Sequence, residues 1–581
     1  MSENELDGKT VEQPEAEAEK PNEIENVAEP NENGAGETVS VNSDGTATAK
    51  KPNKFLQKLD NFFGIKKAGS SFKTEIIGGL VTFMAMVYIL MVNANMFARP
   101  GVEFDLVPDS GLGGFMWNVF GGAPKGDAFD AASSAAYGAV YIATALSAIV
   151  GTMLMSLVAR LPMAQASGMG LNAFFVYTIC LGFGLSYANA LVLVLIDGVV
   201  FILLTVTGLR KKLFNAIPKT VRVAIPAGIG LFIAFIGMQN VGLVVADGAT
   251  LVKLASFNLL PESMGGSATY GSIMPLIVTI LGLIAIAILA KKKVKGAVLY
   301  SILGSAALYW VFMGIGYGIK DESCMGVING FTLSNPIDAF KNWGEMSVVQ
   351  VFTNGFDFSA YIAKNGGANL ALVIITSSLA FCMVDMFDTM GTLYGACARG
   401  NMLEKDGSIP NMNKAMLCDA VATTTGAICG TSTVTTFVES SSGIAAGART
   451  GFSSLITAGC FLVAMFLSPI AEMIPSCATS VALIYVGVLM MNCVREIEWT
   501  DAAEAVPAFL TIAMMSFTYN ISYGIAFGII SWLIIRLILN LVSLASKKKD
   551  GTVELVKEDE KISVVTIVIA VLFVLMFFLT H

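Results

Sequence analysis

Histidine is almost absent from this chain, because the one histidine among 581 residues is His581. Imidazole is the commonest metal ligand in proteins and the usual proton carrier near neutral pH. The 9 cysteines include no CxxC pair, which leaves no zinc-type cluster, and we expect free thiols. We therefore predict no metal site and no cofactor. Any proton chemistry must depend on carboxylates.

Charged residues are also scarce. They make up 14% of the chain, compared with roughly 25% in soluble domains, whereas 55% of the residues are hydrophobic and the mean hydropathy is +0.69. Nearly uncharged runs of about 18 or more residues recur along the chain, and this length crosses the hydrocarbon of a bilayer. The composition therefore predicts an all-α polytopic protein embedded in a lipid bilayer.

The first part of the chain has the opposite composition. Residues 1–49 are rich in Glu, Pro, Asn and Ser and contain no apolar stretch of the signal-peptide type, which predicts a disordered acidic cytoplasmic tail. The acidic excess of this tail is larger than the whole formal net charge of −8, so the charge says nothing about nucleic acid, and we expect no such partner. Residues 50–71 form a basic juxtamembrane segment, which favours a cytoplasmic N-terminus.

Fourteen apolar spans are predicted, seven in each half of the chain. We assign residues 72–318 to the first repeat, 319–366 to an extracellular loop and 367–543 to the second repeat. Residues 544–581 form a cytoplasmic linker and an extra apolar helix, Val564–Leu579, which could span the bilayer or lie along its surface. The predicted spans are 76–97, 134–158, 163–183, 187–208, 220–243, 273–290 and 295–318, then 368–393, 414–429, 432–447, 451–469, 476–493, 503–518 and 521–543.

Basic clusters indicate how these spans are oriented. They follow even-numbered spans at Arg210–Lys212, Lys291–Lys293 and Lys547–Lys549, as expected of cytoplasmic loops. An odd number of spans in each half gives the two halves opposite orientations in the membrane. This is the inverted-repeat plan of many secondary transporters.

The third and tenth spans are poor transmembrane helices. They read ASGMGLNAFF (Ala166–Phe175) and GTSTVTTFVESSSG (Gly430–Gly443), with Gly, Ser and Thr where long apolar side chains would be expected. We predict that each is an extended segment leading into a short helix near the middle of the membrane, where open backbone is stable only beside a cavity or a ligand. The alternative is ordinary close packing of helices through small residues.

Carboxylates inside the spans are the candidate functional residues. The eighth span, LAFCMVDMFDTMGTLYG, places Asp385 and Asp388 on one helical face, and Glu439 lies in the tenth span. A charge at this depth costs at least about 2.5 kcal/mol, so we expect each acid to have a function. A buried hydrogen bond or ion pair is the alternative for each, and Asp419 in the ninth span is the acid for which we favour that structural role.

Five sequence segments together resemble the adenine/guanine/hypoxanthine permeases, the purine branch of the nucleobase/cation symporter superfamily. The resemblance covers residues 72–543 and implies a seven-plus-seven fold with a core domain and a gate domain. It also implies that spans three and ten form short strands that cradle the base, and it makes a homodimer through the gate domain plausible. The segments are GLVTFMAMVYILMVNANM from Gly79, GMGLNAFF from Gly168, DMFDTMGTLYG from Asp385, GTSTVTTFVESSSGIAAGARTG from Gly430 and IPSCATSVALIYVGVLMM from Ile474.

The resemblance carries functional residues onto this chain by motif. It implies substrate binding by Gly170, Asn172, Asp385 and Glu439, and proton coupling by Asp388. Related uracil and xanthine carriers commonly have a histidine in the eighth span, and its absence here favours the purine branch. No catalytic residue and no metal ligand is implied.

The chemistry of these side chains agrees with that assignment. A neutral purine offers N–H donors and ring-nitrogen acceptors, which suit the carboxylate of Glu439 and the amide of Asn172. A carboxylate in a low-dielectric site, such as Asp385 or Asp388, can take up a proton outside and release it inside. We assign Asp385 mainly to the substrate and Asp388 mainly to the proton. Three aromatic side chains either wall the base or simply pack: Phe174, Phe175 and Phe437.

We therefore predict a secondary active transporter that imports purine nucleobases by proton symport across the plasma or inner membrane. Two alternatives share its plan, namely a sulfate-permease-like anion carrier, which would need positive charge at its site, and a sodium-coupled nucleobase carrier. A membrane enzyme or a channel would need a metal motif, a nucleophile constellation or a repeated filter sequence, and the sequence contains none.

Overall fold

The computed structural model describes residues 39–41, 47–49, 54–98, 127–208, 217–258, 268–329, 335–404, 408–550 and 562–579. It divides into two compact units, Met1–Leu59 and Asp60–His581. In the first unit, β1 (Val39–Val41) and β2 (Ala47–Ala49) pair as antiparallel strands. The rest of the predicted tail, the cluster Arg210–Lys212 and His581 lie outside the described residues.

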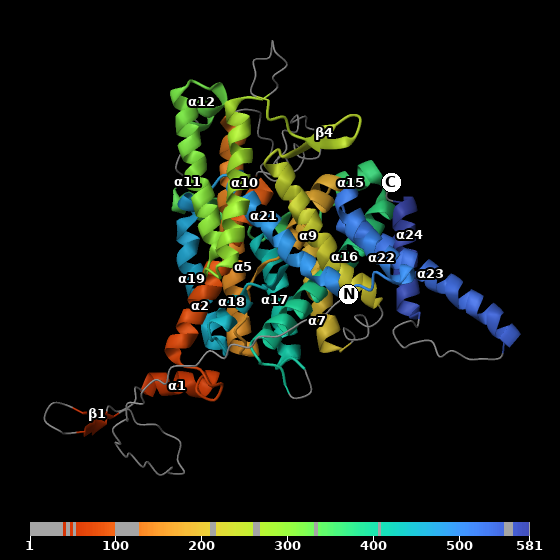
Figure 1. Cartoon of the computed structure of the whole chain (residues 1–581), viewed down its shortest axis with the longest axis horizontal. Coiled ribbons are helices and arrows are strands. Elements are labelled where there is room, and N and C mark those ends of the chain that lie inside the picture. Colours follow the sequence, from red (N-terminus) through yellow and green to blue (C-terminus); the bar gives the residue numbers. More distant parts are fainter. Residues whose placement is uncertain are drawn as a thin grey trace, which may run out of the picture. The chain divides into compact units, whose positions relative to one another are not determined.

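The helices of the first half follow the predicted spans closely (Figure 1). After α1 (Lys54–Phe63), the elements are α2 (Phe72–Met86), α3 (Tyr88–Ala98), α5 (Asp127–Leu154), η1 (Met155–Ala159), β3 (Gln165–Ser167), α6 (Met169–Ala173), η2 (Phe174–Gly182), α7 (Tyr187–Val206), α9 (Lys219–Asn240), the hairpin β4 (Val244–Asp247) and β5 (Leu251–Leu254), α10 (Tyr270–Lys291) and α11 (Ala297–Gly318).

The second half repeats this order after four short helices in the predicted extracellular loop. Those four are α12 (Glu322–Asn329), α13 (Pro336–Met346), α14 (Gln350–Thr353) and α15 (Ser359–Asn365). The second half contains α16 (Gly367–Arg399), α17 (Met412–Cys429), β6 (Val434–Thr436), α18 (Ser440–Ala445), α19 (Gly451–Ala464), η4 (Met465–Leu467), α20 (Ser468–Glu472), α21 (Ser476–Met490), η5 (Met491–Glu496), α22 (Ala502–Phe517), α23 (Ile521–Asp550) and α24 (Val564–Leu579).

Ten helices in the described part of the chain are long and apolar enough to cross a membrane. Spans nine and thirteen are α17 and α22. Spans three and ten are not continuous helices: each consists of a short strand followed by a helix, β3 before α6 and β6 before α18. The predicted polytopic fold of seven plus seven spans, with short strands in its two broken spans, is thereby confirmed.

The two strands pair with each other across the two halves of the chain. They are antiparallel, with Gln165 opposite Thr436 and Ser167 opposite Val434. Single backbone bonds extend the pairing at both ends, because Gly168 N–H donates to Thr433 O at 3.0 Å and Phe437 N–H donates to Ala164 O at 3.0 Å. Backbone N–H and C=O groups of each strand are therefore hydrogen-bonded by the strand of the other repeat, as burial in a membrane requires.

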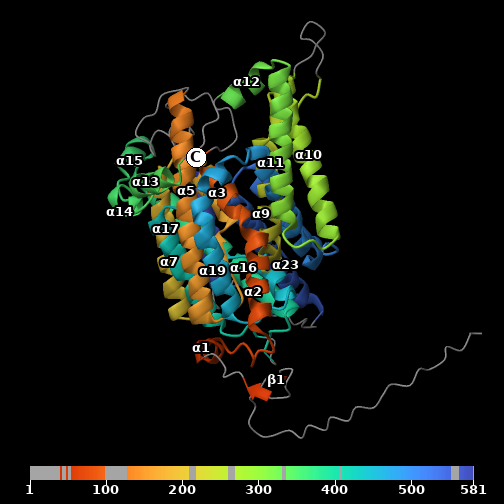
Figure 2. The same cartoon turned by 90° about the vertical axis from the view of Figure 1, so that its left-hand side faces the viewer.

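The helices pack into two groups. The core group contains α2, α3, α5, α7, α16, α17 and α19 around the strand pair, and the gate group contains α9, α10, α11, α21, α22 and α23. Figure 2 shows α5, α7, α17 and α19 together on one side of the molecule and α9, α10 and α11 on the other. Small residues allow α2 to cross α18 at backbone contact, since a Cβ added to Gly78 would lie 3.1 Å from the carbonyl oxygen of Gly443.

The extra C-terminal helix, α24, packs against α16 and α23. Its side chains Ile569, Ala570 and Phe573 are buried, whereas Val564, Val568 and Phe578 are exposed. One face of this apolar helix therefore contacts the protein and another faces outward.

Candidate substrate site

A cavity of about 1530 Å³ lies between the core and the gate helices. On the core side it is lined by α2, by the start of α6, by α16 and by the segment from β6 into α18. On the gate side it is lined by α9, by the turn between α10 and α11, and by the end of α21 with η5. The two broken spans thus reach the cavity at the point where strand passes into helix.

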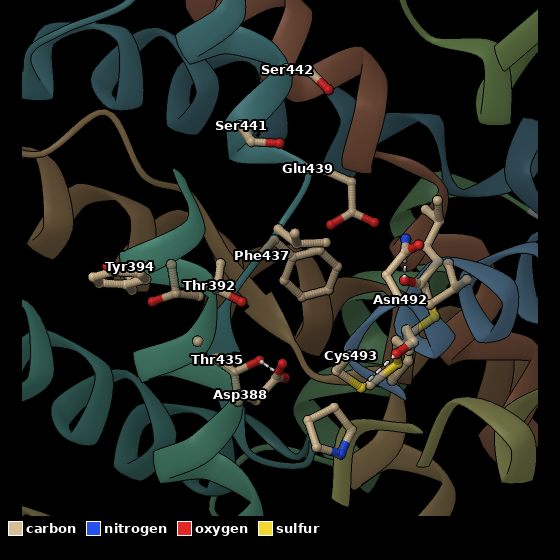
Figure 3. A pocket seen from close by; sticks show the side chains of 18 of the residues that line it. Asp388, Thr392, Tyr394, Thr435, Phe437, Glu439, Ser441, Ser442, Asn492 and Cys493 are labelled. Atoms are coloured by element: carbon tan, nitrogen blue, oxygen red, sulfur yellow. Dashed lines mark hydrogen bonds between the residues drawn. The ribbon is translucent and has the colours of Figure 1, made fainter. Parts of the chain in front are cut away.

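Two carboxylates project into this cavity from the core. Glu439 is the N-cap residue of α18 and Asp388 lies in the middle of α16. Figure 3 shows both side chains in the pocket with the ring of Phe437 between them. Thr435 Oγ1 donates to Asp388 Oδ2 at 3.4 Å, and Tyr88 Oη donates to Glu439 Oε1 at 2.5 Å.

Gly170, the third predicted residue that lines the cavity, marks a close approach between core and gate. A Cβ added there would clash with Cγ2 of Ile229 on α9, closer than real Cβ atoms come to a neighbour. The position therefore requires glycine because of the gate helix beside it. The structure brings Gly170, Asp388 and Glu439 to one cavity.

Asn172 and Asp385 are not among the residues that line the cavity. Both side chains are fully buried. Asn172 Nδ2 donates to Ser167 O at 3.5 Å, and its Oδ1 accepts a hydrogen bond from Ser432 Oγ. Asp385 Oδ2 accepts a hydrogen bond from Thr423 Oγ1 at 3.4 Å. The structure buries both side chains away from the cavity lining, in contact with polar groups of the core.

Asp385 belongs to a cluster of three buried acids, Asp197 on α7, Asp385 on α16 and Asp419 on α17, which we call the buried acid cluster. Oδ1 of Asp385 and Oδ1 of Asp197 are buried without a hydrogen-bond partner among the described residues. In the described part of the chain none of the three forms a salt bridge. Burial without a cation opposes ionisation of all three carboxylates at once.

Asp419 is the best satisfied member of the buried acid cluster. It accepts hydrogen bonds from Gln165 Nε2 at 2.7 Å, Thr389 Oγ1 at 2.8 Å and Thr436 Oγ1 at 3.2 Å. These donors come from β3, α16 and β6, so one carboxylate on α17 joins both strands to the eighth span. The structural role that we favoured for Asp419 agrees with these contacts.

Strand alternation separates the two sets of acids. Neighbouring side chains of a strand point to opposite faces. Thr435 donates to Asp388 on the cavity face, whereas Thr436 donates to Asp419 on the buried face. Phe437 shares the parity of Thr435 and lines the cavity. The strand pair therefore lies between Asp388 and Asp419, and Thr436 also lines the cavity.

Sequence reasoning did not identify Asp197. This residue is fully buried, and its Oδ2 accepts a hydrogen bond from Thr433 Oγ1 at 3.5 Å. It is the one acid in the apolar helix Tyr187–Val206, so the criterion that identified the other intramembrane acids would have found it. Among the described residues, no group of three His, Cys, Asp or Glu side chains has a geometry that could hold a metal ion.

Of the three aromatic candidates, one lies at the cavity. Phe437 lines it, whereas Phe174 and Phe175 are fully buried among other rings. Phe174 packs edge to face against Phe381 at 4.8 Å between ring centroids, and Phe175 packs against Phe97 at 5.0 Å. Phe174 and Phe175 thus contribute to packing in this conformation.

Basic side chains also line the cavity. Exposed side chains there include Lys219, Lys293 and Lys295, and Arg222 and Arg399 also line it. By contrast, all eleven residues of α3, the second half of span one, are buried. Exposed basic side chains therefore border the cavity, and no residue of α3 lines it.

Comparisons with known proteins agree with this architecture. A family model described as "Permease family" matches residues 126–527. The guanine/hypoxanthine permease PbuG of Bacillus subtilis is 36% identical over 464 residues, which cover 80% of this chain and 90% of the relative. The adenine permease AdeP of Escherichia coli K12 is 32% identical over 464 residues, which cover 80% of this chain and 87% of the relative.

A solved structure described as the overall structure of SLC26A9 shares the fold alone. Its TM-score is 0.50 at 10% identity, over 84% of this chain and 70% of that one. It has the same inverted plan of seven plus seven spans. The chain belongs to the permease family, in the branch that contains the adenine and guanine/hypoxanthine permeases.

Proposed function

We propose that this protein imports purine nucleobases (adenine, guanine and/or hypoxanthine) by proton symport. The observation that carries the proposal is the cavity at the broken spans, where Glu439 and Asp388 face open space from the core. Relatives at 32% and 36% identity are named as adenine and guanine/hypoxanthine permeases. Two carboxylates beside an aromatic ring suit a flat, neutral ligand that offers N–H groups.

Glu439 is the proposed acceptor for purine N–H groups. One of its oxygens accepts from Tyr88, which leaves the other for the ligand. Gly170, on the core side like Glu439, leaves room for Ile229 of the gate helix α9. Asn172 and Asp385, which we predicted as direct substrate partners, are proposed to support the site from outside the cavity lining in this conformation, because neither lines the cavity.

Asp388 is the proposed proton carrier. It faces the same cavity as Glu439 and has one weak hydrogen bond, from Thr435. Two carboxylates that share a low-dielectric site do not ionise independently. Proton uptake by Asp388 on one side of the membrane and its release on the other would couple purine movement to the proton gradient.

The cavity supports a proposed orientation in the membrane. Its lining contains Lys293, which belongs to the predicted cytoplasmic clusters, and α2 lines it through Val81 and Ala85. Basic residues concentrate on the cytoplasmic side of membrane proteins. We therefore propose an inward-open conformation in the plasma or inner membrane, with the N-terminus in the cytoplasm.

The outer surface of the gate helices supports the proposed lipid and protein partners. Val311 of α11, Phe509 of α22 and Leu541 of α23 are exposed. Apolar side chains on a membrane protein's outside face lipid or another subunit. We propose a bilayer around the molecule and a homodimer through the gate group.

The alternative of an anion carrier of the sulfate-permease type fits this site less well. Glu439 and Asp388 would repel an anion at the core wall, and the three lysines that line the cavity lie beside loops that we expect in the cytoplasm. Sodium coupling remains a second candidate because carboxylates also bind sodium.

Uptake measurements test the proposal. The protein is expressed in cells that lack purine transport, and uptake of labelled adenine, guanine and hypoxanthine is followed with and without a pH gradient and with and without sodium. We expect saturable uptake driven by an inward proton gradient and blocked by unlabelled purine. Uptake blocked by sulfate, or driven by sodium and indifferent to pH, would contradict it.

A further inference from the structure

Tyr88 occupies an unusual place in span one. It is the first residue of α3 and follows Val87, the C-cap residue of α2, where the span is interrupted. Its side chain is fully buried and does not line the cavity. Its hydroxyl nevertheless reaches the cavity's carboxylate, because Oη donates to Glu439 Oε1 at 2.5 Å.

A buried phenol needs an acceptor, and most find a backbone carbonyl. Tyr141 is such a case: it is buried and donates to Ala464 O at 2.9 Å. Tyr88 instead uses one oxygen of the half-buried side chain that we propose as the substrate acceptor. A distance of 2.5 Å is that of a charge-assisted O–H···O⁻ bond, the stronger kind.

Packing between their segments holds Tyr88 and Glu439 in fixed relative positions. Glu439 begins α18, and α18 lies against α2 at backbone contact, since a Cβ added to Gly78 would lie 3.1 Å from Gly443 O. Glu75 of α2 also accepts from the N–H groups of Arg449 at 2.8 Å and Thr450 at 3.3 Å, just beyond α18. The first span and the segment that carries Glu439 therefore form one packed unit.

We propose that Tyr88 is a positioning residue for purine binding, a role that rests on the proposed function. Its hydroxyl fixes the rotamer of the Glu439 carboxylate, directs the second oxygen into the cavity and favours the ionised form that accepts purine N–H groups. Tyr88 itself does not contact the base. Other titratable groups line the same cavity as Glu439: Asp388, Lys219, Arg222, Lys293, Lys295, Tyr394, Arg399, Tyr485, Cys493 and Glu496.

The test compares Tyr88→Phe with Tyr141→Phe, which also removes one buried hydroxyl. Equilibrium binding of adenine, guanine and hypoxanthine to the purified protein is measured from pH 5 to pH 8. We expect Tyr88→Phe to weaken binding about tenfold to a hundredfold, as loss of a hydrogen bond to a charged group does. The pH below which affinity falls should move upward, because the hydroxyl no longer favours the ionised carboxylate. Tyr141→Phe should bind as the wild type does.

A double variant separates positioning from packing. Adding Tyr88→Phe to Glu439→Gln should cause little further loss, because the two residues act through one bond. If Tyr88→Phe does not purify as a folded protein, 3-fluorotyrosine at position 88 keeps the ring and strengthens the donor, and the affinity loss at low pH should then begin at lower pH.

Three results would overturn the inference. They are wild-type affinity and pH profile in Tyr88→Phe, fully additive losses in the double variant, and an unchanged pH profile with fluorotyrosine. Each leaves the proposed function standing if the wild type binds purine. Failure of the wild type to bind any purine would refute both.

Discussion

The two faces of the β3–β6 strand pair contact the same kind of side chain in different settings. On the cavity face, Asp388 and Glu439 have few protein partners and open space in front of them. On the buried face, Asp419 accepts three hydrogen bonds from strands and helix. An acid in a membrane span can line a cavity, as Asp388 and Glu439 do, or be buried among hydrogen-bond donors, as Asp419 is, and only the first kind is placed to bind a ligand.

The largest expected effect concerns the cavity face. Glu439→Gln keeps the shape of the side chain but removes the charge that we propose accepts purine N–H groups. We expect purine affinity to fall by about a hundredfold, roughly the worth of a charge-assisted hydrogen bond, with normal insertion and thermal stability. Binding by purified protein measures this, and Glu498→Gln at an exposed site is the control. Unchanged affinity would remove Glu439 from the site.

The buried face should respond in the opposite way. Asp419→Ala leaves the donors of Gln165, Thr389 and Thr436 unpaired, which we expect to cost about 3 kcal/mol or more of stability. Thermal unfolding in detergent measures the loss. Asp197→Asn is the matched control. Asp197 accepts one long hydrogen bond, from Thr433, so we expect this substitution to change stability little. A stable Asp419→Ala protein that has lost purine affinity alone would break the distinction between the faces.

A smaller effect is expected where core meets gate. Gly170→Ala introduces a methyl group that clashes with Ile229, so the two groups of helices cannot approach as they do here. We expect uptake to slow by about tenfold while binding from the open side is retained, since the clash costs on the order of 1 to 3 kcal/mol. Ile229→Ala in the same protein should restore the rate. Failure of that rescue would assign Gly170 a role other than close approach.

Much of this fold could be predicted from the sequence because membrane burial leaves few options. Length and hydropathy located the helices, and the Gly, Ser and Thr content of spans three and ten predicted the strands that the structure contains. Those strands have few apolar residues for packing, so their stability depends on pairing across the repeats. The composition of these segments therefore already indicates that they need a partner strand.

The direction of each side chain was harder to predict. Asp385 and Asp388 are three residues apart, which separates them by about 60° around a helix. On α16 this angle is enough to place Asp388 at the cavity and Asp385 in the buried acid cluster. Asn172 likewise depends on Ser432 of the other repeat, a partner 260 residues away that no local pattern reveals. Such positions follow from how the repeats pack.

The central claim is that the cavity couples purine binding to a proton through Asp388. Asp388→Asn mimics a permanently protonated carboxyl group, so the variant should still bind purine and exchange it by counterflow, but should not accumulate it against a gradient. The direct measurement is purine uptake in vesicles with an imposed pH gradient, beside counterflow without one. We predict wild-type counterflow, within about threefold, and no gradient-driven accumulation. Accumulation by Asp388→Asn at the wild-type level would contradict the account.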